Sequence, residues 1–296
     1  MERSNNPIFG ISLILVAFFI FSFIAASGKW LIIAGIAPMQ MVFMRYFGHL
    51  IISFSIISRH RIQLSNFHTK DLFLVLLRSF FLFSSTALQF LAFQYLPLAI
   101  TATIEFTAPI IICLLSWPIL GERVGPFRSF AIIFGFLGVL IIIRPFGEEF
   151  HPSAILSLMG ASCFAIYAIL SRKLAGRVTV DLMQFYSGLL GSVLVLPFIF
   201  VIWSNPTNNF DWIILILIGA FGWLGHQLLT YAHTFAEANL LTPFGYSFII
   251  YSTIWSFFIS NYLPDKWTIL GGSLIVLSGV VIWLRELKKA SLPVKS

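Results

Sequence analysis

The segment IFGISLILVAFFIFSFIAASG, residues 8–28, contains no charged side chain. It is long enough to cross the hydrocarbon part of a bilayer as one α-helix, which needs about 20 mostly apolar residues. A signal peptide would also be apolar, but Glu2 offsets Arg3 in the short preceding stretch and many similar segments follow. We therefore interpret residues 8–28 as the first membrane-spanning helix.

The composition extends this interpretation to the whole chain of 296 residues. Hydrophobic residues make up 59% and charged residues 10%, whereas a soluble domain is about half apolar and a quarter charged. Helices are required because unpaired backbone groups cannot face lipid, and the alternation typical of a membrane barrel is absent. The sequence predicts an all-α membrane protein with ten transmembrane helices. The nine further spans are expected near residues 38–58, 72–95, 98–118, 126–144, 153–171, 181–203, 212–234, 240–261 and 267–284.

The distribution of Lys and Arg predicts the orientation. If both ends of the chain are cytoplasmic, thirteen of these residues fall on the inside and only Lys29, Arg144 and Lys266 on the outside. Cytoplasmic loops carry the excess of positive charge in membrane proteins. The inside set is Arg3, Arg59, Arg61, Lys70, Arg123, Arg128, Arg172, Lys173, Arg177, Arg285, Lys288, Lys289 and Lys295. The prediction is an N-in, C-in protein with an even number of spans.

The chain also repeats itself. Lys29 and Lys173 each end the first span of a half, and Met39-Gln40 matches Met183-Gln184 at the same offset. Because each half has an odd number of spans, the halves must insert in opposite orientations, as in many secondary transporters with a substrate site near the midplane. Chance similarity between apolar helices is the alternative explanation. The predicted repeats are residues 8–145 and 153–284.

Ionisable residues inside spans are costly and are therefore candidates for function. Glu105 lies about seven residues into its predicted span. An isolated carboxylate there would be protonated or paired. It is either a proton-coupling or ammonium-binding acid, or half of a structural ion pair with Arg45 or Arg78. These two arginines could bind an anionic substrate group or connect helices.

Other polar residues share helix faces with these. Gln89 follows Arg78 and Ser85 on one face, and His226 and His233 share a face two turns apart. The histidines lack further ligands nearby, so no metal site is predicted. Lys29 is either an interfacial cation at a helix end or a residue at the mouth of the pathway. A third set suits a wall that stacks a planar ring and hydrogen-bonds its edge: Tyr167, Tyr231, Tyr246, Tyr251 and Trp255.

Several classes of function are excluded or disfavoured. No P-loop, nucleophile elbow or HExxH motif is present, so we expect neither an enzyme nor an ATPase, and no cofactor. No basic stripe with interleaved aromatics indicates nucleic-acid binding. A lipid-modifying membrane enzyme would need clustered acids or histidines at one membrane face. A protein without transport activity would have no use for Arg45, Glu105 and His226 inside spans. The expected partners are a small-molecule substrate and the lipid bilayer.

The order of short motifs along the chain resembles a known family. In the first half they are Arg78-Ser79, Tyr95-Leu96-Pro97-Leu98-Ala99, Pro109 and Gly121-Glu122-Arg123-Val124. In the second half they are Gly225-His226, Pro243-Phe244, Tyr246 and the run from Pro264 to Gly272. Together they resemble the two EamA domains of the drug/metabolite transporter superfamily, over nearly the whole chain. The second half departs from the first: it lacks the Gly-Glu-Arg turn, and Leu189 stands at the repeat position of Arg45.

This resemblance implies a ten-helix carrier in the bacterial cytoplasmic membrane that moves a small organic solute by alternating access. The segments around Gly225-His226-Gln227 and from Ala238 to Tyr246 are similar to those of riboflavin uptake carriers. The ending Pro264-Asp265-Lys266 is similar to that of S-adenosylmethionine uptake carriers. Amino-acid and metabolite exporters share the fold. We expect riboflavin or another planar metabolite, with S-adenosylmethionine or an exported metabolite as the alternative and proton coupling through Glu105 as a hypothesis.

Overall fold

A computed structural model describes residues 6–60, 69–120, 126–145, 151–174, 176–235 and 241–290. These ranges contain helices and no strand, which confirms the all-α class. The helices are α1 (Pro7–Ile33), α2 (Pro38–His60), α3 (Thr69–Ala92), α4 (Leu98–Glu105), α5 (Ala108–Leu120), α6 (Pro126–Ile143), α7 (Ser153–Leu174), α8 (Val180–Ile202), α9 (Asn209–Phe235), the 3-10 helix η1 (Thr242–Tyr246), α11 (Ser247–Ser260) and α12 (Lys266–Ala290). The Gly121-Glu122-Arg123-Val124 motif and Ala238 lie outside the described residues.

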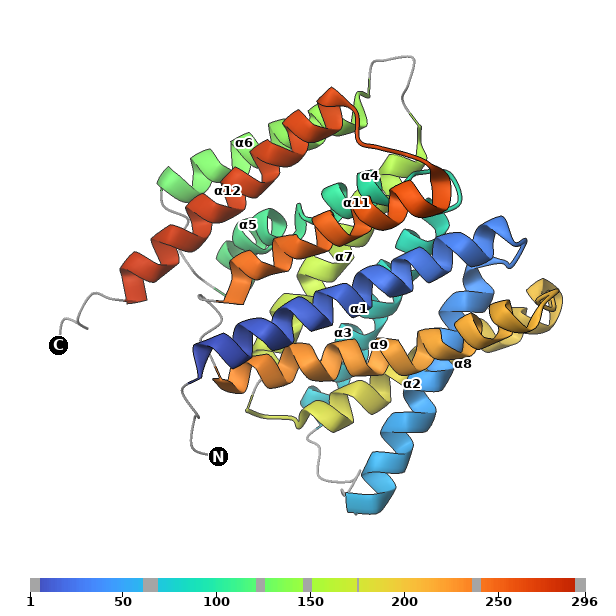
Figure 1. Cartoon of the computed structure of the whole chain (residues 1–296). Coiled ribbons are helices and arrows are strands. Elements are labelled where there is room, and N and C mark those ends of the chain that lie inside the picture. Colours follow the sequence, from blue (N-terminus) through green and yellow to red (C-terminus); the bar gives the residue numbers. More distant parts are fainter. Residues whose placement is uncertain are drawn as a thin grey trace.

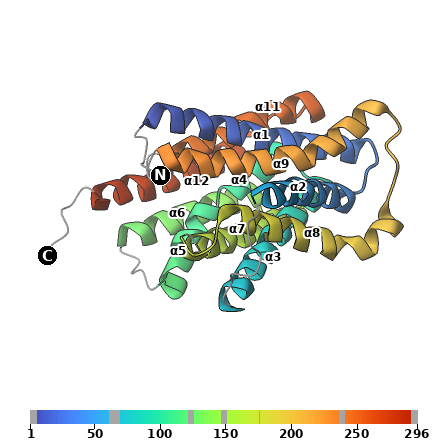
Figure 2. The same ribbon diagram turned by 90° about the horizontal axis from the view of Figure 1, so that it is seen from below.

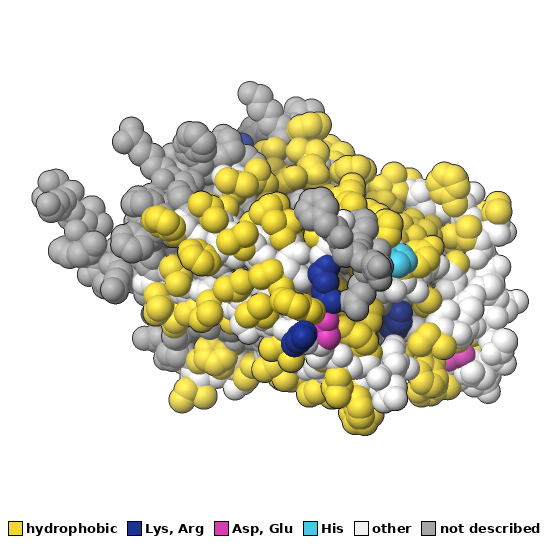
Figure 3. All heavy atoms as spheres, turned by 90° about the horizontal axis from the view of Figure 1, so that it is seen from above, with side chains coloured by type: hydrophobic (Ala, Val, Ile, Leu, Met, Phe, Trp, Pro, Cys, Tyr) yellow, Lys and Arg dark blue, Asp and Glu magenta, His cyan; other side chains and the backbone are white. Residues whose placement is uncertain are grey.

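The long helices are apolar enough to span a membrane. Among the described residues, α1, α2, α3, α7, α8 and α9 each contain an apolar stretch of 22 to 26 residues. Large hydrophobic side chains cover the outside of the bundle, as Figure 3 shows for one face; Phe200 and Val201, for example, are 84% and 86% exposed. An exterior of this kind is stable in lipid and unstable in water. The protein is a multi-pass membrane protein.

Local sequence explains where several helices begin. Asn6 accepts a hydrogen bond from the backbone N–H of Phe9 at the start of α1, and Pro7 is the first helical residue. Asn208 accepts from the N–H of Asp211 at the start of α9. Such caps satisfy backbone donors that have no partner inside the helix.

The structure corrects the sequence interpretation of 98–118 as a continuous helix, and it shows that the described part of 240–261 changes from a 3-10 helix to an α-helix. The first divides into α4, which ends at Glu105, and α5, which begins at Ala108. Pro109 explains this break because proline has no N–H for the carbonyl four residues earlier, and its ring crowds that carbonyl. The second predicted span contains η1, with Pro243 near its start, before α11. Glu105 therefore lies at a helix end and not in the middle of a helix.

Helices of the first half pack against helices of the second half. The most extensive contacts join α2 to α8, α3 to α7, α1 to α9 and α6 to α12. Figures 1 and 2 show these pairs side by side, with α1, α9 and α11 in one layer and α3, α5 and α7 in the other. Helices from these two predicted spans also meet, since α4 contacts α11. The core between the layers is therefore built by both halves.

Candidate functional site

A cavity of about 430 Å³ lies between the two layers. Five residues singled out from the sequence line it, and they come from five different helices. They are Arg45 of α2, Gln89 of α3, Glu105 of α4, Tyr167 of α7 and His226 of α9. Pockets of about 300–1,000 Å³ with mainly apolar walls and a few polar groups are typical of small-molecule sites.

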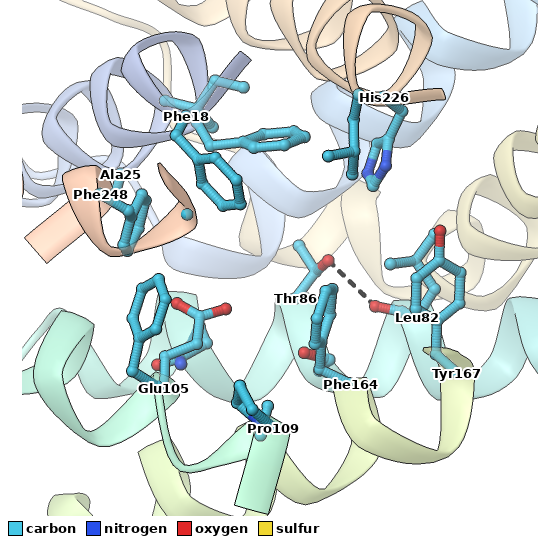
Figure 4. Close-up of a pocket in the computed structure, with 18 of the residues that line it drawn as sticks. Phe18, Ala25, Leu82, Thr86, Glu105, Pro109, Phe164, Tyr167, His226 and Phe248 are labelled. Carbon is cyan, nitrogen blue, oxygen red and sulfur yellow. Dashed lines mark hydrogen bonds between the residues drawn. The ribbon is translucent and has the colours of Figure 1, made fainter. Parts of the chain in front are cut away.

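Glu105 forms one end of this cavity. Figure 4 shows its carboxylate pointing into the open space, on the side that faces Phe18 and Phe248. Within the described residues, the carboxylate has no hydrogen bond, and no Lys or Arg nitrogen lies within 4.0 Å of it. The ion pair with Arg45 or Arg78 considered from the sequence is therefore not formed in this structure.

Arg45 lies in the cavity wall and interacts with Glu105 electrostatically without touching it. Its side chain runs along Gly222 of α9, where a Cβ would lie 3.3 Å from Arg45 Cγ. A glycine at this position leaves room for the arginine stem. The cavity wall therefore holds a basic and an acidic side chain that do not form an ion pair with each other.

Arg78 is used differently. It is 4% exposed and does not line the cavity in the described part of the chain. Its guanidinium donates hydrogen bonds to Ser171 Oγ (2.7 Å), Ser187 Oγ (3.0 Å), the Met183 carbonyl (3.3 Å) and Tyr167 Oη (3.0 Å). It also lies 4.5 Å from the centre of the Tyr167 ring. Arg78 thus connects α3 with α7 and α8.

His226 and Gln89 are buried cavity residues with unsatisfied polar atoms. Nε2 of His226, and both Oε1 and Nε2 of Gln89, have no hydrogen-bond partner among the described residues. The His226 ring packs against Phe21 at 5.0 Å and lies 6.3 Å from the ring of His49, whose Nε2 is also unpartnered. Buried polar atoms without partners are uncommon and indicate a ligand, an ion or water.

The aromatic residues predicted to form a wall lie in different places. Tyr167 lines the cavity, and the ring of Tyr246 lies 5.0 Å from that of Phe106, which is a lining residue. Tyr251 and Trp255 instead pack on Phe19 between α1 and α11. Tyr231 is 52% exposed on α9. Seven further lining residues are phenylalanines that the sequence interpretation did not single out: Phe18, Phe21, Phe90, Phe93, Phe106, Phe164 and Phe248.

Lys29 is buried at the end of α1. Its Nζ donates to the backbone carbonyls of Phe93 (2.5 Å) and Leu96 (3.1 Å), just beyond the end of α3. A cation is favoured there because the last carbonyls of a helix lack helical donors. Lys29 thus holds the chain beside Phe93, a residue that lines the cavity.

Comparisons with known proteins agree with this architecture. An S-adenosylmethionine uptake transporter of Rickettsia bellii is 28% identical over 219 residues, 74% of this chain and 75% of that protein. A riboflavin transporter of Vibrio cholerae is 27% identical over 184 residues, 62% of each. A solved crystal structure superimposes with a TM-score of 0.65 at 17% identity, over 96% of this chain and 99% of the other, which shows a shared fold.

A comparison with models of protein families identifies the family of this chain. The model of the EamA-like transporter family matches residues 8–144 and again residues 151–284. These two matches leave only the ends of the chain and a short connection uncovered. The relatives and the family are transporters and not enzymes. This chain therefore belongs to the EamA-like transporter family of the drug/metabolite transporter superfamily.

Proposed function

We propose that the protein is a secondary transporter whose substrate is a positively charged or zwitterionic organic metabolite that binds in the cavity. The observation that carries this proposal is the carboxylate of Glu105, which has no partner among the described residues and lies in an otherwise mainly apolar space. An isolated carboxylate is costly in such surroundings unless a cation or a proton accompanies it. A cationic substrate group would supply that partner.

The break in the helix strengthens the preference for a cation. Glu105 is the last residue of α4. The carbonyl groups at a helix C-terminus carry partial negative charge, and Pro109 deprives the Glu105 carbonyl of its helical donor. Carboxylate and carbonyls together favour a cation at this end. In transporters with inverted repeats, the ends of discontinuous helices commonly form the substrate or ion site.

The arrangement of helices supports alternating access by two inverted repeats with ten spans. The pairing of α1 with α9 mirrors that of α3 with α7 when spans are counted within each half. The start of α1 and the end of α12 lie at the same end of the bundle (Figure 1). Both features agree with an N-in, C-in chain in a bacterial cytoplasmic membrane, whose halves rock about the cavity.

S-adenosylmethionine is the substrate to test first. It combines a sulfonium cation, an ammonium group and a carboxylate, which would suit Glu105 and Arg45 together. Its uptake is the activity named for the Rickettsia relative. Riboflavin is the second candidate because seven phenylalanine side chains line the cavity. A neutral flavin ring would leave the Glu105 carboxylate without a partner, so we favour the cation.

Glu105 also suggests how transport could be driven. A carboxylate that binds either a proton or the cationic substrate would couple the two by competition for one site. The predicted result is exchange of substrate against protons. No direction of transport is implied, because the imposed gradients decide it.

Uptake by reconstituted protein tests the proposal. Proteoliposomes containing the wild type, Glu105→Asp and Glu105→Gln are given radiolabelled S-adenosylmethionine or riboflavin, with and without a pH gradient. We expect Glu105→Gln to reduce S-adenosylmethionine uptake about tenfold to a hundredfold. This range corresponds to the free energy of a hydrogen bond to a charged group. Glu105→Asp should retain more activity, and only the wild type and Glu105→Asp should respond to the gradient. Undiminished uptake by Glu105→Gln would refute the role of Glu105, and riboflavin uptake alone would favour the second candidate.

A further inference from the structure

Gln89 brings a carboxamide without a hydrogen-bond partner among the described residues to the wall of the cavity. It lies on α3 one turn after Ser85, and both residues line the cavity. The side chain is 5% exposed, and neither its Oε1 nor its Nε2 has a partner among the described residues. Leaving a buried amide unpaired costs free energy. A structural role would normally satisfy at least one of these atoms.

The position of this amide is fixed by its packing. Gly160 of α7 lies against the aliphatic part of the Gln89 side chain. A Cβ at Gly160 would be 3.3 Å from Gln89 Cγ and 3.4 Å from the carbonyl oxygen of Ser85. The glycine therefore lets α7 approach α3 while holding the glutamine stem between the two helices. A held stem with a free amide is suited to binding because little side-chain entropy remains to be lost.

We infer that Gln89 recognises the edge of a planar heterocycle in the substrate, and that this heterocycle is an aminopurine. A carboxamide offers one donor and one acceptor side by side, whichever way its O and N are assigned. An adenine edge offers the complementary pair, and glutamine is a usual partner of adenine. Phe164 and Tyr167 lie in the same cavity as rings on which a base can stack (Figure 4).

The inference deepens the proposed function and rests on it. Glu105 and Arg45 would bind the charged part of the substrate, and Gln89 would select its ring. A flavin ring also has a donor beside acceptors, but it brings no cation for Glu105. The combined site therefore describes a cationic nucleoside, and Gln89 is its specificity-determining residue.

Binding to the purified protein in detergent tests this assignment. The ligands are S-adenosylmethionine and S-methylmethionine, which has the same sulfonium amino acid without the nucleoside. The variants are Gln89→Leu and, as a matched control, Gln94→Leu, which changes an exposed glutamine just beyond the same helix. We expect Gln89→Leu to weaken S-adenosylmethionine binding about tenfold to a hundredfold. S-methylmethionine binding should stay unchanged, and Gln94→Leu should behave as wild type.

Thermal unfolding of the same variants separates recognition from structure. Because Gln89→Leu removes two unsatisfied polar atoms, its melting temperature should equal or exceed that of the wild type. If this variant fails to fold, Gln89→Met, which has a similar length, replaces it. An unchanged ratio of the two affinities in Gln89→Leu or Gln89→Met would overturn the assignment of Gln89 alone. A wild type that binds neither sulfonium would overturn both this inference and the cationic substrate.

Discussion

Arg78 and Glu105 are both charged residues within the helix bundle, but they differ in their hydrogen bonding. Each nitrogen of the Arg78 guanidinium donates a hydrogen bond, to partners on α7 and α8. Glu105 has no such partner among the described residues and faces a cavity. A satisfied buried charge connects helices, whereas an unsatisfied one remains available to a ligand. Charge inside a span therefore does not by itself identify a binding residue.

The strongest test of this contrast is the removal of Arg78. Arg78→Met should lower the free energy of unfolding in detergent by about 3 kcal/mol, because several hydrogen bonds to a charged group are lost together. The loss should be smaller than the number of partners suggests, because single hydrogen bonds between helices contribute little free energy in membrane proteins. Chemical unfolding followed by tryptophan fluorescence measures the change. Arg59→Met, which changes an exposed arginine near the end of α2, should leave stability unaltered. Equal stability of the two variants would show that the Arg78 cluster is not structural.

Tyr167 allows a finer test because it belongs to both regions. Its hydroxyl accepts from Arg78, and its ring lines the cavity. Tyr167→Phe should destabilise the protein by about 1 kcal/mol through loss of one hydrogen bond. The ring is retained, so S-adenosylmethionine affinity should change less than about twofold, the equivalent of about 0.4 kcal/mol. A tenfold loss of affinity with unchanged stability would place the hydroxyl on the substrate and break the distinction between the two regions.

The sequence predicted the class of fold because long apolar segments between polar turns have few alternatives in lipid. It also predicted Arg45, Gln89, Glu105, Tyr167 and His226 as candidates, and the structure places these five around one cavity. Their roles remain predictions. Helical spacing alone could not distinguish the surroundings of Arg78 from those of Glu105. Spacing shows which residues share a helix face, but it does not show whether that face packs on another helix or lines a cavity.

The differences between the sequence interpretation and the structure have physical causes. The helix break after Glu105 was encoded by Pro109, but the apolar run concealed it because hydropathy is insensitive to a missing N–H. Tyr251 and Trp255, which the sequence suggests as wall residues, contact Phe19 between two helices. The phenylalanines of the cavity were not identified, since 33 of them are spread through the chain and carry no polar atom to mark a direction.

A third charged site shows how much burial matters. Arg144, just after α6, pairs with Asp265, just before α12. Their side chains are 23% and 39% exposed, so solvent screens the pair and its contribution should stay below about 1 kcal/mol. Asp265 has a second role, because its Oδ1 accepts the backbone N–H of Thr268 (2.8 Å) and caps α12. Asp265→Asn should keep the cap and lose only the pair, whereas Asp265→Ala should lose both.

The pH dependence of stability distinguishes the pair from the cap. Partial burial alone would raise the pKa of Asp265, but hydrogen bonding from Thr268 and the charge of Arg144 outweigh it and hold the pKa below its usual value. A lowered pKa means that the folded state favours the carboxylate. The stabilisation is therefore complete above the unfolded pKa of about 3.9 and disappears as the pH falls through the folded value. Melting temperatures of the wild type and Asp265→Asn should differ slightly at pH 7 and converge below about pH 3. If the difference in melting temperature persists at low pH, the contribution of Asp265 to stability does not depend on the charge of its carboxylate. Burial alone would then not explain why exposed and buried charges contribute differently to the stability of this protein.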